Sequence, residues 1–461
     1  MAPATSAQIR QDTLVARTSP VPVALDRTSG TPLPTQLAAA VRDQVLDGVL
    51  PVGHRLPSTR ALAADLDVSR SVTEQAYDQL AAEGWVEGRH GSGTYVAGGA
   101  LARRRRRPSR PRPQEPALLR LDTGTPWIDP RLRAAWRRAW RDVSAATPPP
   151  AYDDPAGLPE LRTELAGHLA RTRGLTCDPD EILVTSGTIG GLSQVLATLP
   201  PGAVAHEDPG YRAAAEAIRA AGRTLRDLPA TRTVTHLGGC VAAYVTPAHQ
   251  HPLGPVMPGA DRLALLSAAH AAGATVLEDD YDSEFRYDVA PVPALAALDR
   301  DVVAYLGTTS KTVAPSMRLG WLVAPPALHR HILQRREVTH DTPAWPVQRA
   351  FFSLLRDGYV DQVVRSARRV YAARAERVVD ALRGLAEPIT PVAGMYATVP
   401  MDQAAARRVA DSAAAAGFEV PLLRDYCRSA DLSGIILGFG GCSDDQLDRA
   451  LAAIVRGLGC R

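Results

Sequence analysis

Residues 302–320 read VVAYLGTTSKTVAPSMRLG and contain Lys311, the single lysine of this 461-residue chain. Lysine and arginine together number 52, so the other 51 of these cations are arginines. A guanidinium stays protonated, whereas an amine can lose its proton and attack a carbonyl group. The apolar run 302–306 predicts a buried strand, which places Lys311 just past a strand end. Composition alone gives equal weight to a surface lysine that is retained by chance.

The sequence around this strand alternates apolar runs with helical stretches rich in alanine, arginine and leucine. From Leu121 onward the alternation predicts an α/β domain with a largely parallel sheet. The candidate strands are residues 182–185, 203–206, 241–245, 275–278, 302–306 and 321–323.

Small hydroxyl side chains, glycine and arginine gather around two of the predicted strand ends. The run 185–189 (TSGTI) lies at a strand-to-helix junction, where free N–H groups can bind phosphate. An amine for a carbonyl carbon, with hydroxyls and a cation for a phosphate, is the set that pyridoxal 5′-phosphate (PLP) requires. The candidate phosphate-binding residues are Ser186, Gly187, Thr188, Thr308, Ser310 and Arg318.

A carboxylate-rich run, residues 278–282 (EDDYD), ends another predicted strand. A carboxylate there would protonate the pyridine nitrogen of PLP and make its ring an electron sink. We assign this role to Asp279 and expect Tyr281 to reach the phenolic oxygen of the cofactor. A metal site or a solvated acidic loop is the alternative, although the run lacks histidine, which disfavours a transition metal. Tyr211, after the run 207–210, is a further candidate to line the ring, and a plain turn explains it nearly as well.

The N-terminal part predicts a winged helix-turn-helix over residues 29–97. Helices are expected at 33–46, 57–66 and about 70–83, followed by a glycine-containing hairpin at 85–96. In such a module the N-terminal residues of the third helix enter the major groove of double-stranded DNA. A small helical interaction module with solvated arginines is the alternative. The predicted DNA-binding residues are Arg60, Ser69, Arg70, Ser71, Thr73, Arg89, His90, Gly91 and Gly93.

The remaining segments complete the predicted organisation. Residues 1–28 are expected to form a flexible arm, and residues 98–120 an Arg/Pro-rich linker, because prolines and like charges prevent a core. Residues 121–461 form the effector domain. Residues 1–117 carry 15 arginines against 11 Asp and Glu, which suits a polyanionic partner. Five scattered cysteines and the lack of a long apolar run predict a cytoplasmic protein with no membrane or metal site.

Two family resemblances join these predictions. Residues 48–96 (GVLPVGHRLPSTRALAADLDVSRSVTEQAYDQLAAEGWVEGRHGSGTYV) resemble the DNA-binding domain of the GntR superfamily. Residues 121–461 resemble fold-type I aminotransferases through the motifs above and through the run 152–157 (YDDPAG). The whole chain looks like a MocR-type transcriptional regulator. The resemblance implies that Lys311 holds PLP as a Schiff base, in a head-to-tail homodimer whose partner subunit supplies Tyr152.

Three positions depart from active aminotransferases. His251 stands where these enzymes have the asparagine of Asn-Pro-x-Gly, and it either contacts the cofactor or only packs. Ile436 stands where they have the arginine that binds the substrate carboxylate, unless Arg424 or Arg428 compensates. The segment after residues 122–126 is shorter than usual, which leaves substrate closure in doubt.

These observations favour a regulator over an enzyme. We expect a DNA-binding protein that senses PLP or a PLP adduct, with control of vitamin B6 synthesis as one role. Two alternatives stay open at this point. One is a working aminotransferase with an appended DNA module, and the other is a DNA-binding protein whose C-terminal domain only dimerises.

Overall fold

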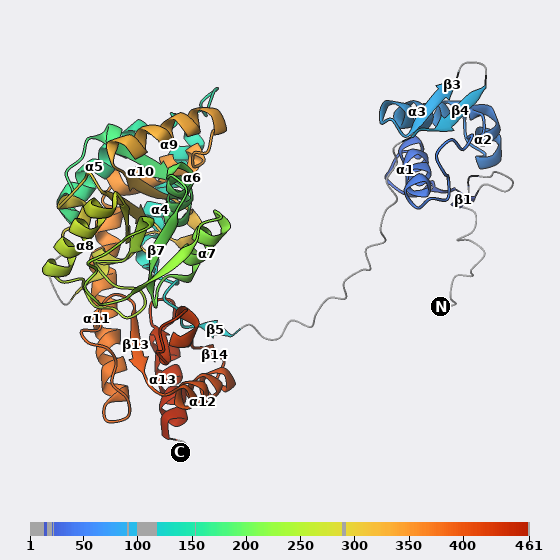
Figure 1. The fold of residues 1–461 in the computed structure, drawn as a ribbon. Coiled ribbons are helices and arrows are strands. Elements are labelled where there is room, and N and C mark those ends of the chain that lie inside the picture. The colour runs from blue at the N-terminus through green and yellow to red at the C-terminus, as the bar shows by residue number, and fades with distance from the viewer. Residues whose placement is uncertain are drawn as a thin grey trace. The chain divides into compact units, whose positions relative to one another are not determined.

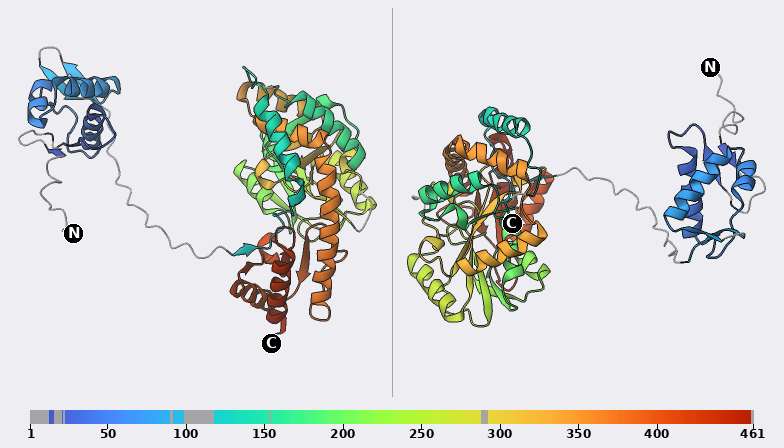
Figure 2. Two further views of the ribbon diagram at one scale, coloured as in Figure 1. Left: turned by 180° about the vertical axis from the view of Figure 1, so that it is seen from behind. Right: turned by 90° about the horizontal axis from the view of Figure 1, so that it is seen from above.

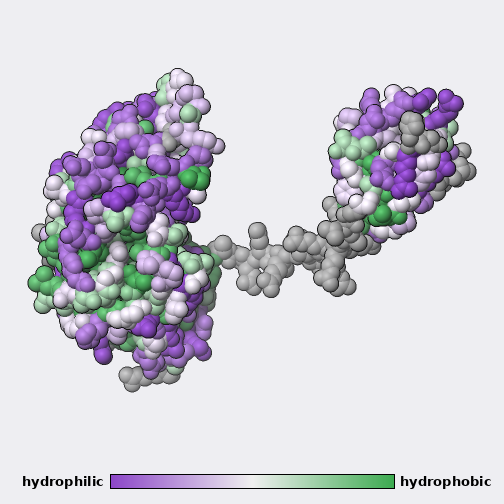
Figure 3. Space-filling model, turned by 45° about the horizontal axis from the view of Figure 1, so that its top comes forward, coloured by the Kyte–Doolittle hydropathy of each residue, from purple (hydrophilic) through white to green (hydrophobic). Residues whose placement is uncertain are grey.

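A computed structural model describes residues 13–15, 21, 23–89, 92–98, 118–152, 154–287 and 292–459. The chain separates into two compact units, Met1–Gln114 and Glu115–Arg461 (Figure 1). Figure 3 shows hydrophilic side chains spread over the visible face of each unit, with apolar ones scattered among them. Within the described residues, no helix has the length and apolar character needed to span a bilayer.

The first unit is a winged helix-turn-helix. It contains α1 (Leu33–Leu46), α2 (Thr59–Leu66) and α3 (Arg70–Ala82), followed by the antiparallel pair β3 (Val86–Arg89) and β4 (Gly93–Val96). Ser58 caps α2, because its hydroxyl accepts a hydrogen bond from the Ala61 amide at 3.2 Å. The predicted helices and hairpin are confirmed.

The predicted flexible arm is wrong where its residues are described, at 13–15, 21 and 23–28. β1 (Thr13–Val15) pairs antiparallel with β2 (Ala24–Asp26), and Val21, Val23 and Leu25 are buried in the same core as the helices. The spacing of two residues is the period of a strand with one face on a core, a signal that the arginines and prolines of this region obscured.

The last residues of the predicted linker, Leu119 and Arg120, belong to the second unit. Residues 99–117 lie outside the described residues. Leu119–Arg120 forms strand β5, which pairs in parallel with β14 (Phe418–Glu419). The second unit therefore begins before Leu121, because its C-terminal part supplies a partner strand.

The second unit is built on a seven-stranded sheet in the order β6-β12-β11-β10-β9-β7-β8. All neighbours are parallel except that β12 runs antiparallel to both β11 and β6. The candidate strands are confirmed, and β8 was missed because this edge strand reads LRDLP and is mostly exposed. The strands are β6 (Ile182–Thr185), β7 (Ala203–Asp208), β8 (Leu225–Pro229), β9 (Cys240–Val245), β10 (Thr275–Asp280), β11 (Val303–Thr308) and β12 (Gly320–Val323).

Helices cover both faces of this sheet, and the long helix α11 continues from it to the C-terminal part (Figures 1 and 2). There β13 (Tyr396–Pro400) and β15 (Gly434–Gly438) pair antiparallel and share a core with α11 to α13. The helices are α4 (Arg133–Ala145), α5 (Pro159–Arg173), α6 (Thr188–Thr198), α7 (Arg212–Ala220), α8 (Gly259–Ala272), α9 (Pro326–Thr339), α10 (Trp345–Arg356), α11 (Tyr359–Leu382), α12 (Gln403–Ala415) and α13 (Asp444–Gly459).

Candidate functional site

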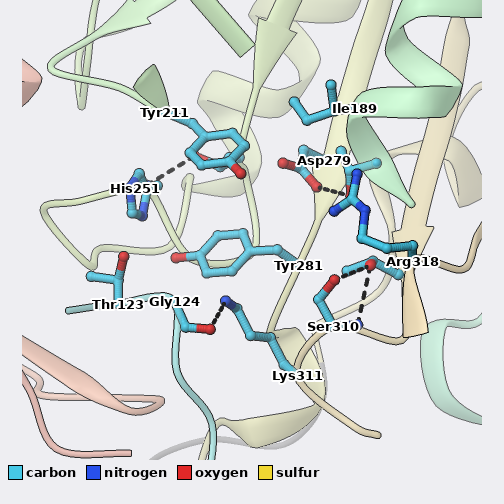
Figure 4. A pocket seen from close by; sticks show the side chains of 13 residues that line it. Thr123, Gly124, Ile189, Tyr211, His251, Asp279, Tyr281, Ser310, Lys311 and Arg318 are labelled. Carbon is cyan, nitrogen blue, oxygen red and sulfur yellow. Dashed lines mark hydrogen bonds between the residues drawn. The ribbon is translucent and has the colours of Figure 1, made fainter. Parts of the chain in front are cut away.

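A pocket of about 110 Å³ lies at the carboxyl ends of β10 and β11 (Figure 4). Open α/β sheets bind ligands at this edge, where loops after the strands converge. Nine of the twelve predicted cofactor residues line the pocket, and the other three do not. The lining consists of Thr123, Gly124, Thr188, Ile189, Tyr211, Thr246, His251, Asp279, Tyr281, Thr308, Ser310, Lys311 and Arg318.

Asp279 is the carboxylate that β10 turns into the pocket. Its side chain is 3 % exposed and accepts hydrogen bonds from the Tyr244 hydroxyl and from Thr188 Oγ1, the latter at 3.3 Å. Burial raises the pKa of Asp279 to about 7. A cation beside this carboxyl would favour its ionised form, so the position suits a protonated ring nitrogen.

The two neighbouring carboxylates of β10 point away from the pocket because strand side chains alternate. Glu278 accepts hydrogen bonds from the amides of Leu295 and Ala296, at 2.7 and 2.9 Å. Asp280 pairs with Arg173 at 2.5 Å. Of the three acidic side chains in this strand, only Asp279 therefore lines the pocket.

Lys311 enters the pocket from the turn after β11. Its Nζ donates a hydrogen bond to the Gly124 carbonyl oxygen at 2.8 Å. Burial lowers the pKa of the Lys311 ammonium, although Asp282, Asp122 and Asp279 oppose that effect. A lowered pKa increases the fraction of neutral amine, which is the nucleophilic form.

A polar cradle lies between Arg318, the turn after β11 and the start of α6. Thr308 Oγ1 and Ser310 Oγ are 2.9 Å apart. Gly187 has φ +82°, and a Cβ at this position would lie 3.9 Å from the Arg318 guanidinium and the Thr308 hydroxyl. The lack of a side chain at Gly187 therefore keeps the cradle open next to the free N–H groups of α6.

Ser186 and Tyr152 lie outside the pocket lining, as does Gly187 itself. Ser186 is exposed beside the cradle. Tyr152 is 79 % exposed, and its ring stacks on His340 with centroids 3.9 Å apart. The predicted role of Tyr152 in the pocket of a partner subunit stays a prediction.

Aromatic rings form the wall that faces Lys311. The His251 ring meets those of Tyr211 and Tyr281 edge-on, each at 5.6 Å between centroids. Burial lowers the pKa of His251 to about 3, and its Nε2 is buried with no hydrogen-bond partner. His251 thus lines the pocket as a neutral ring. The Tyr281 hydroxyl already contacts the Tyr396 hydroxyl at 2.9 Å, so its predicted contact to the cofactor oxygen stays a prediction.

The expected carboxylate-binding arginine has no replacement in the pocket. Ile436 is fully buried in the core around β15. Arg424 donates to the Ala430 carbonyl oxygen at 3.0 Å, and Arg428 donates to Asp227 at 2.6 Å. Among the described residues that line the pocket, Lys311 and Arg318 are the cationic side chains.

The predicted DNA-contacting residues at the N-termini of α2 and α3 are mostly exposed. Arg60 lies in the first turn of α2, and Ser69 and Arg70 lie at the start of α3 with Ser71. Arg70 pairs with Glu74 at 2.7 Å, an exposed i,i+4 pair of small energetic weight. These side chains are available to phosphates and bases.

Thr73 is the exception and corrects the prediction. It is fully buried, and its hydroxyl donates to the carbonyl oxygens of Thr59 and Arg70, both at 2.9 Å. Thr73 lies three, four and seven residues before Ala76, Tyr77 and Leu80, so it belongs to the inner face of α3. Its side chain joins α2 to α3 and cannot contact DNA.

The wing is described only in part, because His90 and Gly91 lie outside the described residues. Arg89 pairs with Glu87 at 2.8 Å and lies 4.6 Å from the centroid of the Tyr95 ring. Gly93 has φ +116°, which favours glycine, and a Cβ there would come within 3.1 Å of Arg55. Arg55 was missed as a residue of this surface.

Sequence reasoning also missed four pocket residues and one supporting residue. Thr123 and Gly124 belong to a turn that was noted only as a departure from aminotransferases. The supporting residue, Tyr244, is the polar member of the strand run CVAAYV, a signal that pointed to a buried partner. Nothing in the sequence singled out Ile189 or Thr246. The structure describes no group of three or more His, Cys, Asp or Glu side chains suited to a metal ion.

Comparisons with known proteins agree with this two-part arrangement. Residues 33–96 match the model for bacterial regulatory proteins of the gntR family, and residues 119–454 match that for class I and II aminotransferases. The chain is 35 % identical to the HTH-type pyridoxine biosynthesis transcriptional regulator PdxR of Corynebacterium glutamicum, over 94 % of this chain and 98 % of that protein. It is 34 % identical to the probable rhizopine catabolism regulatory protein MocR of Rhizobium meliloti, over 90 % and 92 %.

Solved structures support the fold of the second unit. An archaeal alanine:glyoxylate aminotransferase superposes with a TM-score of 0.66 at 23 % identity, covering 74 % of this chain and 90 % of that one. This match shows the fold of the second unit, and the family models and full-length relatives show the two-part arrangement of the chain. The chain belongs to the MocR-type family of HTH transcriptional regulators, which join a GntR-type DNA-binding domain to an aminotransferase-like domain.

Proposed function

We propose that this regulator binds PLP covalently through Lys311 and that PLP binding changes its affinity for operator DNA. One observation carries the proposal. Lys311 and Asp279 enter one pocket on either side of Tyr281 (Figure 4), so an amine and a carboxyl flank an aromatic-lined space. The genes under control would include those for pyridoxine biosynthesis, as the name of the Corynebacterium relative suggests.

Several pocket residues have a task that fits the cofactor. When bound, PLP supplies an aldehyde carbon and an electron-withdrawing pyridine ring. Lys311 holds the aldehyde carbon with its amine, and Asp279 holds a proton on the ring nitrogen. Arg318, with the hydroxyls of the turn after β11 and the N-terminus of α6, binds the phosphate. His251, whose Nε2 is buried and unpaired, offers that atom to the cofactor ring.

The pocket favours sensing over turnover. An amino acid substrate needs a cation for its α-carboxylate, and Ile436 is apolar and fully buried where aminotransferases place that arginine. Leaving a carboxylate without a partner costs about 1–3 kcal/mol or more. We therefore propose PLP itself as the signal, and an aminotransferase-like domain that works mainly as a receptor.

The assembly we propose is a homodimer in head-to-tail arrangement that binds double-stranded DNA. The position of Tyr152 supports this arrangement, because its ring, stacked on His340, is 79 % exposed at a surface that another subunit can contact. Residues 29–97 would form the DNA-binding domain, with Arg60, Ser69, Arg70 and Ser71 at the DNA. The segment 98–120 would link it to the effector domain.

The test measures DNA affinity against PLP concentration. Fluorescence anisotropy with DNA from upstream of the host pyridoxine biosynthesis genes would compare the wild type with Lys311→Ala. We expect PLP to change the affinity of the wild type at least fivefold and to leave the variant unchanged. Equal affinity of the wild type with and without PLP would refute sensing, and rapid release of 2-oxo acid from amino acids would favour the enzyme alternative.

A further inference from the structure

A second cavity lies behind the loop that carries His251. Its volume is about 170 Å³, which exceeds the 110 Å³ of the cofactor pocket. The wall is largely apolar and includes Leu228, Val234, Val245 and Met257. Dry apolar cavities of about 150 Å³ bind benzene, so this cavity has room for one ring.

The inner end of the cavity carries one buried carboxyl group, Glu207. The residue is 4 % exposed, and three hydrogen bonds reach its Oε2. The donors are Thr246 N at 3.1 Å, Thr246 Oγ1 at 2.6 Å and Gln250 Nε2 at 3.4 Å. Burial raises the pKa of Glu207 to about 7.

The second oxygen of Glu207 has no such task. Within the described residues Oε1 accepts no hydrogen bond, and it is not among the sealed polar atoms that lack a partner. Glu207 lines this cavity, and Oε1 is its carboxyl oxygen without a protein donor among the described residues. An acceptor of this kind recognises a hydrogen-bond donor.

The cavity reaches the surface at its other end. Thr231 and Arg232 both line the cavity, and both are exposed. A ligand can therefore enter without unfolding of the core.

We propose that this cavity binds a second small molecule, with an apolar body of about one ring and a hydrogen-bond donor that reaches Glu207 Oε1. The ligand is either a cationic donor or a neutral hydroxyl. An anionic group at the inner end is disfavoured when Glu207 is ionised, because it offers no donor. This site is separate from the cofactor pocket and holds whether or not PLP is the signal.

Thr246 connects the two sites. It lines both cavities, and its Oγ1 donates to Glu207 while it accepts a hydrogen bond from the His251 amide at 2.9 Å. A ligand at Glu207 changes the charge that Thr246 faces, and hence the position of His251 at the cofactor. This coupling, unlike the binding itself, rests on the proposed PLP function.

The experiment uses three probes of one size on the full-length protein at pH 8. Benzamidine is a cationic donor, benzyl alcohol is a neutral donor, and benzoate has no donor. Calorimetry on PLP-free protein should show binding of benzamidine or benzyl alcohol at least tenfold tighter than binding of benzoate. A crystal soaked with the tighter probe should place its donor at Glu207.

Two variants test the location. Val234→Phe fills the cavity and should weaken binding of the tighter probe at least tenfold, whereas Leu263→Phe, at a site 63 % exposed, should leave it unchanged. Glu207→Gln replaces one carboxylate oxygen by an NH2 donor and removes the charge. It should weaken the binding of benzamidine more than that of the other two probes. Because Val234→Phe does not alter Glu207, it remains decisive if Glu207→Gln fails to fold.

Three results would overturn the proposal: benzoate binding as tightly as the donors, unchanged binding in Val234→Phe, or a probe seated elsewhere in the crystal. The coupling has its own readout in the visible absorbance of PLP-loaded protein. We expect the tighter probe to shift that spectrum, and binding without a shift would refute the coupling alone. Failure of the protein to take up PLP would refute the proposed function and leave the calorimetry on PLP-free protein valid.

Discussion

The effector-domain site has two ends, the pocket of Lys311 and Asp279 and the region of Ile436 and Arg428. They differ in whether their side chains face the pocket or contact other parts of the protein. At the cofactor end, Lys311 and Asp279 face the pocket and the Gly187 turn leaves space for a phosphate. At the carboxylate end, Ile436 is fully buried, and Arg428 is held by Asp227 at 2.6 Å. At the first end an amine and a carboxyl line one pocket, and at the second end Ile436 belongs to the core and Arg428 to an ion pair.

This difference bears on whether the site is suited to holding a cofactor or to turning over a substrate. Holding a cofactor needs an amine, a carboxyl and a phosphate cradle, whereas turnover also needs a cation for the substrate carboxylate. A site that keeps the first set and lacks the second is suited to a receptor. The following predictions test the two ends separately, from the largest expected effect to the smallest.

Lys311→Ala should abolish covalent capture of PLP at the cofactor end. Because Lys311 is the single lysine, the wild type has one side-chain amine for the aldehyde. We expect borohydride to fix one PLP on the wild type and none on the side chains of the variant, as measured by peptide mass spectrometry. Asp279→Asn, which keeps the amine, should still be labelled. Labelling of Lys311→Ala at any side chain would contradict this assignment.

Asp279→Asn should stabilise the PLP-free protein as the pH rises. Burial raises the pKa of Asp279 from 3.8 to about 7. The folded state therefore takes up a proton between these values, and the wild type loses stability as the pH rises through this window. At pH 8 we expect the variant to gain up to about 4 kcal/mol in free energy of unfolding, and close to nothing at pH 4.

The measurement is urea unfolding of both proteins from pH 4 to pH 8. Glu278 is also buried with a pKa raised to about 7, but it is present in both proteins and its contribution cancels in the difference. Glu207 has a pKa raised to about 7 in part by the charge of Asp279, so its titration adds to the pH-dependent difference. A gain that is independent of pH would show that Asp279 is already ionised in the folded state, contrary to the prediction.

Gly187→Ala should weaken PLP binding about tenfold without loss of covalent capture. The residue has φ 82° and ψ 179°, a conformation in which a side chain costs about 1–3 kcal/mol, so alanine should shift this turn away from the geometry that faces the phosphate. Its Cβ would also face Arg318 and Thr308 at 3.9 Å. Fluorescence titration with PLP measures the affinity. Gly259→Ala, where a Cβ meets no atom within 4 Å, is the matched control.

Arg424→Ala should have the smallest effect, below twofold, on any response to amino acids. The guanidinium donates to the Ala430 carbonyl oxygen at 3.0 Å and does not line the pocket. The response is measured as the change in visible absorbance of PLP-loaded protein after addition of an amino acid. A large loss would mean that Arg424 replaces the missing carboxylate arginine, and the contrast between the two ends would fail.

The DNA-binding module shows where a pattern sufficed and where it did not. The bounds of α1 were predicted correctly, because apolar residues recur at helical spacing before Gly48. Thr73 was assigned to DNA by its place near the start of α3, although its spacing to Tyr77 and Leu80 already put it on the inner face. The prediction relied on the polar side chain of Thr73, whereas the helical spacing of Thr73 gave the correct position on the inner face.

The sequence by itself determined the composition of the cofactor end. One lysine after a strand, a carboxylate at a neighbouring strand end and a glycine turn are local features, and parallel strands bring their carboxyl ends to one edge. It also determined the winged helix-turn-helix, because helical periodicity and turn residues are local signals.

Only the tertiary structure decided which of these side chains are free to act. Because side chains alternate along β10, Asp279 faces the pocket and Asp280 forms an ion pair with Arg173. The loop after β14 packs so that Arg428 donates a hydrogen bond to Asp227. The unpaired Nε2 of His251 and the second oxygen of Glu207 are likewise results of packing. These contacts join residues far apart in the chain, and their partners depend on the folded geometry, which no local pattern encodes.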